Sequence, residues 1–287
     1  MKSTKKIKIM TKENSKVWFI TGASSGFGKA LTQYAVSQGH KVVATARRQE
    51  KLEQLAKTAS EQILPISMDV TKREEIKNAV KKAIEKYNRI DVLINNAGYG
   101  IVGALEETPE AEFRNQMETN FFGALAVTQE VLPQLRKQKS GAIVNMSSMG
   151  GNMSFGGFSA YSASKFALEG ASEALAQEVA PFGIKTMIVE PGAFRTEFAG
   201  SALKHMPRIE AYDAIVGGTR DFAKDMDGTQ QGDPFKAAKA IEIALDSEHT
   251  PLRLQLGKDA VDAIKEHAEQ LLEDLESWRE TAIATSF

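Results

Sequence analysis

Short runs of β-branched and other apolar residues alternate with longer amphipathic segments along most of this 287-residue chain, and this alternation constrains the fold most strongly. The runs with the composition of buried parallel strands are residues 17–21, 41–46, 63–68, 91–96, 142–147 and 184–190. Between them, segments such as 71–87 place apolar residues at helical spacing. Because crossovers between parallel strands are right-handed, this repetition predicts an α/β fold with one doubly wound parallel sheet flanked by helices.

The same pattern predicts how the chain is divided. No Pro/Gly/Ser-rich linker interrupts residues 17–190, so we expect residues 16–287 to form a single catalytic domain after a flexible basic leader at 1–15. The pattern lapses at 192–234, a length that is uncommon for a loop without a function. Apolar residues are frequent there, and we expect a substrate-binding lid.

The last amphipathic segment, residues 258–283, follows a helical segment that starts near Phe235 and a strand-like run at 252–257. One apolar stripe runs along it, formed by Val261, Ile264, Ala268, Leu271, Leu275 and Trp278. Such a stripe most often packs on its own domain, which is the expectation here, and a seam between two subunits is the alternative.

Charge and composition argue against several classes of function. The formal net charge of -1 gives no field that would gather nucleic acid or anionic lipid, so we expect a small-molecule partner recognised at a local site. No apolar run could span a bilayer and the leader lacks the apolar core of a secretory signal, so we expect a cytoplasmic protein that binds no membrane. With no cysteine and four histidines outside any ligand or nucleophile motif, we expect neither a metal site nor hydrolase chemistry.

A glycine-rich stretch, TGASSGFGKA, directly follows the first strand run and carries Gly22, Gly26 and Gly28. Glycines at a strand-to-helix turn let the backbone approach a pyrophosphate, and the free amides at the helix start attract its charge. We therefore expect a dinucleotide here. The other expected loop contacts are Ser24, Ser25 and Phe27. A nucleoside-triphosphate loop is disfavoured because Ala30 stands where a magnesium-binding hydroxyl is needed.

The end of the second strand run indicates which dinucleotide is preferred. NAD would favour an acidic residue that accepts from the ribose 2′-hydroxyl, but Ala46 is followed by Arg47 and Arg48. A guanidinium pairs well with a 2′-phosphate, so we expect Arg47 to favour NADP(H), with NAD(H) possible. The alternative is that both arginines only begin a solvated helix.

Tyr161 stands four positions before Lys165, so on a helix both side chains lie on one face. Reduction of a carbonyl requires a proton donor, and the reverse reaction uses the same group as base. An ammonium about 4 Å from the phenolate would stabilise it by roughly 4 kcal/mol, so we expect Lys165 to lower the pKa of Tyr161 toward neutrality. Ser148 follows the run 142–147 and can donate to the developing oxyanion, with Ser147 as its competitor.

In sequence order, the glycine loop, Asp69-Val70, NNAG at 95–98, Asn120, Ser148, Tyr161 with Lys165, and PG at 191–192 resemble the short-chain dehydrogenase/reductase family over nearly the whole chain. The resemblance implies a single-domain Rossmann fold with strand order 3-2-1-4-5-6-7. It also implies an NAD(P)-dependent oxidoreductase that interconverts ketones or aldehydes and alcohols, similar to the bacterial branch of hydroxysteroid and retinol dehydrogenases. The catalytic set that it implies is Asn120, Ser148, Tyr161 and Lys165.

The family pattern also implies cofactor contacts and an assembly. Besides the loop, Arg47, Tyr161 and Lys165, the implied cofactor residues are Asp69, Val70, Asn95, Ala97, Gly98, Pro191, Gly192 and Thr196. Family members that prefer NADPH often carry a basic residue where Ser25 stands, so Arg47 would determine the preference largely alone. Helices that carry Asn120 and Tyr161 commonly build contacts between subunits, so we expect a homodimer or homotetramer.

The segment between Ser148 and Tyr161 is apolar and built from small residues, which favours a lipophilic small-molecule substrate over a sugar phosphate. The residues expected to contact this substrate are Ser148, Tyr161, Tyr99, Phe155 and Phe194. The alternative function is a catalytically idle, dinucleotide-binding redox sensor, which would have no use for the four implied catalytic residues.

Overall fold

The computed structural model describes residues 15–285 and 287, so residues 1–14 of the expected leader lie outside the described residues. Its strands are β1 (Val17–Thr21), β2 (Lys41–Ala46), β3 (Ile63–Ser67), β4 (Val92–Asn95), β5 (Gly100–Val102), β6 (Gly141–Met146), β7 (Ile184–Pro191), β8 (Leu203–His205) and β9 (Arg253–Leu256). Its α-helices are α1 (Gly26–Ser37), α2 (Gln49–Ala56), α3 (Arg73–Tyr87), α4 (Glu110–Met117), α5 (Gly123–Gln138), α6 (Ser159–Val179), α7 (Gly218–Asp225), α8 (Pro234–Leu245), α9 (Lys258–Ser277) and α10 (Arg279–Ile283). Short helical turns are η2 (Glu118–Phe122), η3 (Met149–Gly151), η4 (Ala180–Phe182), η5 (Glu210–Tyr212) and η6 (Asp213–Gly217).

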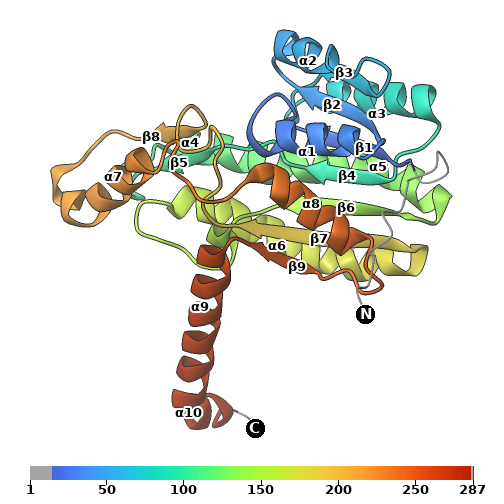
Figure 1. Cartoon of the computed structure of the whole chain (residues 1–287). Coiled ribbons are helices and arrows are strands. Elements are labelled where there is room, and N and C mark those ends of the chain that lie inside the picture. The colour runs from blue at the N-terminus through green and yellow to red at the C-terminus, as the bar shows by residue number, and fades with distance from the viewer. Residues whose placement is uncertain (1–14, 286) are drawn as a thin grey trace, which may run out of the picture.

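Seven strands form one parallel sheet in the order β3-β2-β1-β4-β6-β7-β9, with helices on both faces (Figure 1). This is the expected order 3-2-1-4-5-6-7, because β5 and β8 belong to a separate two-stranded sheet. The doubly wound Rossmann fold is therefore confirmed. Each expected strand run is a strand whose ends differ from the expected ends by at most one residue.

The large sheet is buried on both faces, which explains why its strands have continuous apolar sequences. In β1, Trp18 and Ile20 enter a core with residues of α1, α2 and α8. Phe19 points to the other face and enters a core with residues of α3, α5 and α6. Successive residues of a strand therefore anchor helices on opposite faces of the sheet.

Residues 192–234, expected to be a substrate-binding lid, contain the elements β8, η5, η6 and α7. The pairing of β5 with β8 ties this segment to the chain that follows β4. Val102, Leu203 and Ala223 form a small separate core there, with Phe158 and Phe198 packed against it. The segment lies beside one end of the large sheet, at the left of Figure 1.

The helix expected over 258–283 is divided at Trp278 into α9 and α10, and α9 extends away from the sheet (Figure 1). Of its apolar stripe, Ile264 is buried, while the exposed fractions are 48% for Val261, 55% for Leu271, 57% for Leu275 and 67% for Trp278. The expectation that this stripe packs on its own domain is therefore wrong. None of the helices within the described part of the chain is both long and apolar enough to cross a membrane.

Candidate active site

A cavity of about 1720 Å³ opens at the carboxyl ends of the central strands of the large sheet. Open α/β sheets bind ligands at this edge. Of the expected site residues, those that line it are Gly22, Ser24, Ser25, Gly26, Phe27, Arg47, Asp69, Val70, Ala97, Gly98, Tyr99, Ser148, Phe155, Tyr161, Lys165, Pro191, Gly192, Phe194 and Thr196. Gly28, Asn95 and Asn120 do not line the cavity.

The glycine loop has the backbone form that its sequence predicts. Gly22 and Gly26 have φ angles of 67° and 50°, in the left-handed region that favours glycine. A Cβ on Gly28 would lie 2.3 Å from the Gly22 carbonyl oxygen, so Gly28 lets the turn close against α1 without itself reaching the cavity. The three glycines thus keep the start of α1 open to a ligand.

The start of α1 already receives an anionic group. The Gly26 amide donates a hydrogen bond to Glu197 Oε2 at 2.6 Å, where Glu197 belongs to the segment 192–234. A free backbone amide at a helix start attracts a carboxylate or a phosphate for the same reason. This contact supports the loop as an anion site, and no motif in the sequence pointed to Glu197.

Arg48 is a second residue for which no specific contact was predicted from the sequence. Its Nη2 donates to Ser24 Oγ at 3.3 Å and to Ser25 Oγ at 3.1 Å, while Arg47 is exposed and also lines the cavity. Both guanidinium groups therefore lie at the loop end of the cavity. The sequence feature that could have indicated the contact of Arg48 with the loop is the pair of adjacent arginines directly after β2.

The expected cofactor contact of Asn95 requires correction. Asn95 is buried at the end of β4, and its Nδ2 donates to Thr128 Oγ1 and to Asn145 Oδ1, both at 2.8 Å. It therefore ties β4 to α5 and β6. The next residue, Asn96, lines the cavity instead and donates from Nδ2 to the Thr21 carbonyl at 2.9 Å.

Asn120 lies in the π-helical turn η2 between α4 and α5, where the helical backbone is distorted. Its Oδ1 accepts from the Tyr99 amide at 3.1 Å, and its Nδ2 donates to the Tyr99 carbonyl at 2.9 Å and to Ser164 Oγ at 3.1 Å. The side chain is fully engaged by protein groups and does not reach the cavity. These bonds hold the backbone of Tyr99, which lines the cavity, against η2 and α6.

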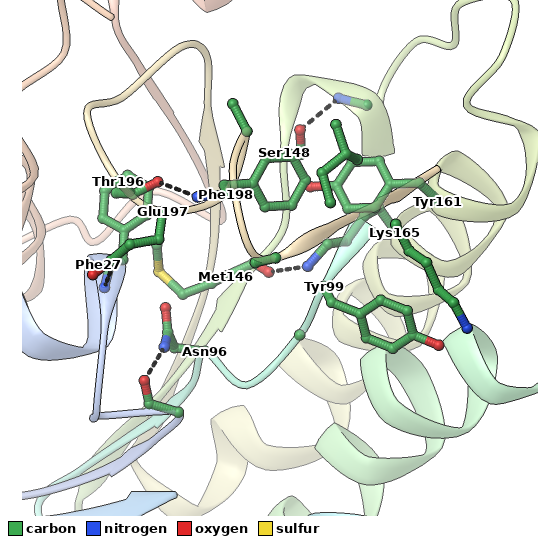
Figure 2. A pocket seen from close by; sticks show the side chains of 18 of the residues that line it. Phe27, Asn96, Tyr99, Met146, Ser148, Tyr161, Lys165, Thr196, Glu197 and Phe198 are labelled. Atoms are coloured by element: carbon green, nitrogen blue, oxygen red, sulfur yellow. Dashed lines mark hydrogen bonds between the residues drawn. The ribbon is translucent and has the colours of Figure 1, made fainter. Parts of the chain in front are cut away.

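Helix α6 presents Tyr161 and Lys165 on one face, and both are buried. Lys165 Nζ donates to the Met146 carbonyl at 2.7 Å and lies 5.7 Å from the centroid of the Tyr161 ring. Figure 2 shows the Tyr161 hydroxyl beside Ser148, whose Oγ accepts from the Gly150 amide at 3.0 Å. Ser147, the competitor of Ser148, instead donates to Glu169 Oε1 at 2.5 Å.

The pKa values of Tyr161 and Lys165 differ from the expectation. Burial raises the pKa of Tyr161 to about 12, and the Ser148 hydroxyl acts in the opposite direction. Burial lowers the pKa of Lys165 to about 8, against the attraction of Glu169. The expected lowering of the Tyr161 pKa by Lys165 is therefore wrong, because the ammonium group faces a carbonyl and desolvation of the phenol dominates. At neutral pH the phenol is protonated and can donate.

Comparison with known proteins identifies the family. Residues 16–207 match the family described as short chain dehydrogenase. The chain belongs to the short-chain dehydrogenase family.

Two relatives of this short-chain dehydrogenase are similar over nearly its whole length, and a third is similar over about three fifths of it. A crystal structure of a short-chain dehydrogenase from Streptomyces avermitilis has a TM-score of 0.90 and 49% identity, and the match covers 96% of this chain and 99% of that one. Oxidoreductase BOA17 of Botryotinia fuckeliana is 42% identical over 95% of this chain and 100% of its own length. The 3-ketodihydrosphingosine reductase of Bacteroides thetaiotaomicron is 49% identical over 62% of this chain and 64% of its own length. This short-chain dehydrogenase is an oxidoreductase that acts on CH-OH or carbonyl groups.

The end of the cavity around Tyr161 is aromatic. The ring centroids of Phe158 and Phe198 lie 6.0 Å and 5.4 Å from that of Tyr161. Farther out, the apolar side chains that line the cavity include Met149, Phe155, Ile215, Phe222 and Met226. Phe194, expected at this end, instead packs on Phe27 of the glycine loop with ring centroids 5.1 Å apart, so its expected substrate contact is corrected.

A buried pair of carboxylates, which no sequence motif predicts, lies behind Lys165. Glu169, one helical turn after Lys165, bonds Ser147, and Glu190 on β7 bonds Gln255. Both glutamates face Arg253, whose Nε lies 3.3 Å from Glu169 and 3.5 Å from Glu190. Burial and the nearby Glu190 raise the pKa of Glu169 to about 7, against the pull of the Ser147 hydroxyl and Arg253.

Glu169→Gln is expected to flatten the dependence of stability on pH. Between the ordinary glutamate pKa of about 4.3 and its value of about 7 in the folded protein, Glu169 binds a proton that the unfolded chain releases. Its contribution to stability is therefore complete below about pH 4 and is lost as the pH rises through 7. Urea unfolding at pH 5 and pH 8 measures this difference in free energy of unfolding.

Glu173→Gln is the matched control, because Glu173 lies one turn farther along α6, bonds the same Arg253 at 2.9 Å and is exposed. The Glu173→Gln variant should keep the full wild-type difference in free energy of unfolding between pH 5 and pH 8. If Glu169→Gln and the wild-type protein showed the same difference in free energy of unfolding between the two pH values, the raised pKa of Glu169 would be contradicted. Loss of the carboxylate also removes an attraction that raises the pKa of Lys165, so the variant's activity should begin to decline at a lower pH.

Proposed function

We propose that this short-chain dehydrogenase interconverts a lipophilic ketone or aldehyde and its alcohol, with NADP(H) preferred, NAD(H) tolerated, and Tyr161 as the proton donor in reduction. One observation carries the proposal. The buried Tyr161 hydroxyl shares a cavity with the glycine loop, adjoins Ser148, and has Lys165 one helical turn away.

The loop end of the cavity fits a dinucleotide. Gly22 and Gly26 place no side chain at the two loop positions with positive φ, and the Gly26 amide already binds a carboxylate oxygen. Arg47 and Arg48 would hold the 2′-phosphate that distinguishes NADP(H) from NAD(H). When bound, such a cofactor supplies or accepts the hydride.

The chain's own groups support the rest of the reduction. The Tyr161 phenol is protonated at neutral pH and sits where it can donate to an alkoxide as it forms. Ser148 can donate to the same oxygen and hold the carbonyl in place. Lys165 is held by the Met146 carbonyl, with its ammonium group 5.7 Å from the centroid of the Tyr161 ring.

A lipophilic substrate is supported by the aromatic and aliphatic lining of the Tyr161 end. In that part of the cavity, Lys204 is paired with Glu112, which leaves its charge unavailable to a phosphate. The relative named 3-ketodihydrosphingosine reductase acts, by its name, on 3-ketodihydrosphingosine. Residues 192–234 would cover this substrate as a lid within a single catalytic domain. We further propose a cytoplasmic homo-oligomer.

The test is NADPH oxidation by the purified protein against 2-ketones and 3-ketones of increasing chain length, with sugar-phosphate ketones alongside. We expect kcat/KM to rise with chain length by roughly threefold to fourfold per methylene until the cavity is filled. Preference for the sugar phosphates would contradict the lipophilic substrate. Cofactor binding without turnover of any carbonyl compound would favour the redox-sensor alternative.

Arg47→Asp is expected to lower the ratio of kcat/KM with NADPH to that with NADH by about 100-fold. A charge-assisted hydrogen bond to a phosphate contributes about 1.5–3 kcal/mol, and an aspartate there would also accept from the 2′-hydroxyl of NADH. Steady-state kinetics with both cofactors at one ketone concentration measures this ratio. Lys51→Asp makes the same charge change on α2 away from the cavity, and it should leave the ratio unchanged. An unaltered ratio in Arg47→Asp would remove Arg47 from cofactor selection.

A further inference from the structure

The apolar stripe of α9 has the spacing of a seam between two helices. Its members follow one another in alternating steps of three and four residues: Val261, Ile264, Ala268, Leu271, Leu275 and Trp278. Strict alternation of this kind is the heptad pattern of a coiled coil, whereas a helix that packs on its own domain has a wider apolar face. The sequence of α9 thus indicates a helical partner.

Within the described residues, the body of the protein covers the seam only at Ile264 and does not supply a partner for the rest of it. α9 begins at the cavity, where Ala260 is buried and Asp259 Oδ2 accepts from the Ala193 amide at 2.6 Å. From Glu269 onward, every described residue of α9 and α10 is exposed, and α9 extends away from the sheet (Figure 1). Helices in proteins owe most of their stability to the packing of an amphipathic face, so the exposed seam of α9 indicates a partner.

The charges along α9 indicate which partner fits. The part of α9 near the body, residues 258–265, has no net charge, because both lysines of the helix, Lys258 and Lys265, balance Asp259 and Asp262. The outer half is acidic, with Glu266, Glu269, Glu273, Asp274 and Glu276. Two parallel copies would bring the acidic halves together, whereas two antiparallel copies bring each acidic half against a half that carries lysines. Charge complementarity therefore favours a second copy of this chain in the antiparallel direction.

Side-chain sizes fit the same arrangement. In the antiparallel register in which Ala268 faces Leu271 of the partner subunit, Val261 faces Trp278 of the partner subunit. Both layers combine a smaller with a larger side chain, which is what dense packing between two helices requires. No layer of this register brings two charged residues into the seam.

We propose that α9 pairs antiparallel with α9 of a second copy along this stripe. The pairing brings the end of the partner's α9 to Val261, two residues after Asp259, which lines the cavity. Assembly of the two copies thereby holds the first turn of α9 against the active site. This interface is separate from the helices that carry Asn120 and Tyr161, which the family resemblance connects with assembly.

Light scattering on the full-length protein tests the interface. Leu271→Glu places a charge in the seam and should reduce the molar mass at micromolar concentration by a factor of about two. Gln270→Glu introduces the same charge at the neighbouring exposed position outside the seam and should keep the wild-type mass. A monomeric wild-type protein, or an unchanged mass in Leu271→Glu, would overturn the proposal. Leu271 lies outside the body, so circular dichroism should show that both variants are folded.

Cysteine cross-linking tests the direction, because the chain has no cysteine of its own. Val261→Cys and Trp278→Cys should form a disulfide with one another when the two variants are equilibrated together and oxidised. Neither variant should cross-link alone, because in an antiparallel pair identical positions near the helix ends are far apart. Cross-linking of either variant alone, or none in the mixture, would overturn the antiparallel arrangement.

Discussion

Tyr161→Phe is expected to lower kcat/KM for carbonyl reduction by roughly 1,000-fold, within the range that general acid catalysis contributes. The variant removes one oxygen, the donor that sits beside Ser148, and leaves the ring among Phe158 and Phe198. Because the buried phenol is protonated over the whole neutral range, the loss should be nearly constant between pH 6 and pH 8. Steady-state NADPH oxidation across this range measures it.

The control for this variant is Tyr87→Phe, which makes the same deletion on α3, away from the cavity. It should keep the wild-type kcat/KM. NADPH binding to Tyr161→Phe, followed by cofactor fluorescence, should remain within about twofold, since the glycine loop and both arginines are untouched. If Tyr161→Phe retained more than a tenth of the activity, another group would have to supply the proton, and the proposed chemistry would fail.

The sheet could be predicted because its strands are buried on both faces. In β1, Trp18 and Phe19 enter different cores, so the strand is apolar from Val17 to Ile20 and differs from the amphipathic helices around it. β5 and β8 could not be predicted, because each has three residues and they are held by pairing of Gly100 with Leu203, far apart in the chain. Local sequence carries no signal for such a pairing.

Some features of the active site could also be predicted from the sequence, and others could not. The relation of Tyr161 to Lys165 follows from helical spacing, which the sequence contains. The choice between Asn95 and Asn96 does not follow from the sequence, because successive side chains of a strand point to opposite faces and the end of β4 decides which one meets the cavity. The direction in which Lys165 turns also depends on a tertiary contact, its bond to the Met146 carbonyl.

The remaining unexpected residues are charged groups that meet only in the folded chain. Glu197 reaches the Gly26 amide from a segment 171 residues away in sequence. Glu169 faces Arg253 across 84 residues. Neither contact has a local pattern, since a glutamate on a helix or in a loop is ordinarily solvated. Predicting these groups requires the packing of β9 and of residues 192–234 against the rest of the chain.

Gly28→Ala is expected to weaken NADPH binding by at least about 100-fold and to lower the free energy of unfolding by about 1–3 kcal/mol, the usual range for overpacking. The new Cβ would lie 2.3 Å from the Gly22 carbonyl oxygen and 2.6 Å from Asn96 Nδ2. The first atom belongs to the backbone and cannot turn aside, so the glycine loop must move away from the start of α1. NADPH titration and urea unfolding measure the two effects.

Gly170→Ala is the matched control, because it makes the same substitution within α6, where a Cβ would meet nothing within 4 Å. Alanine in a helix interior stabilises by about 0.5–1 kcal/mol relative to glycine, so this variant should unfold at higher urea concentration and bind NADPH normally. If Gly28→Ala bound NADPH as the wild-type protein does, the close approach of α1 to β1 would not be what shapes the phosphate site. If it lost stability but not affinity, Gly28 would serve packing alone, and the anion site would depend on Gly22 and Gly26.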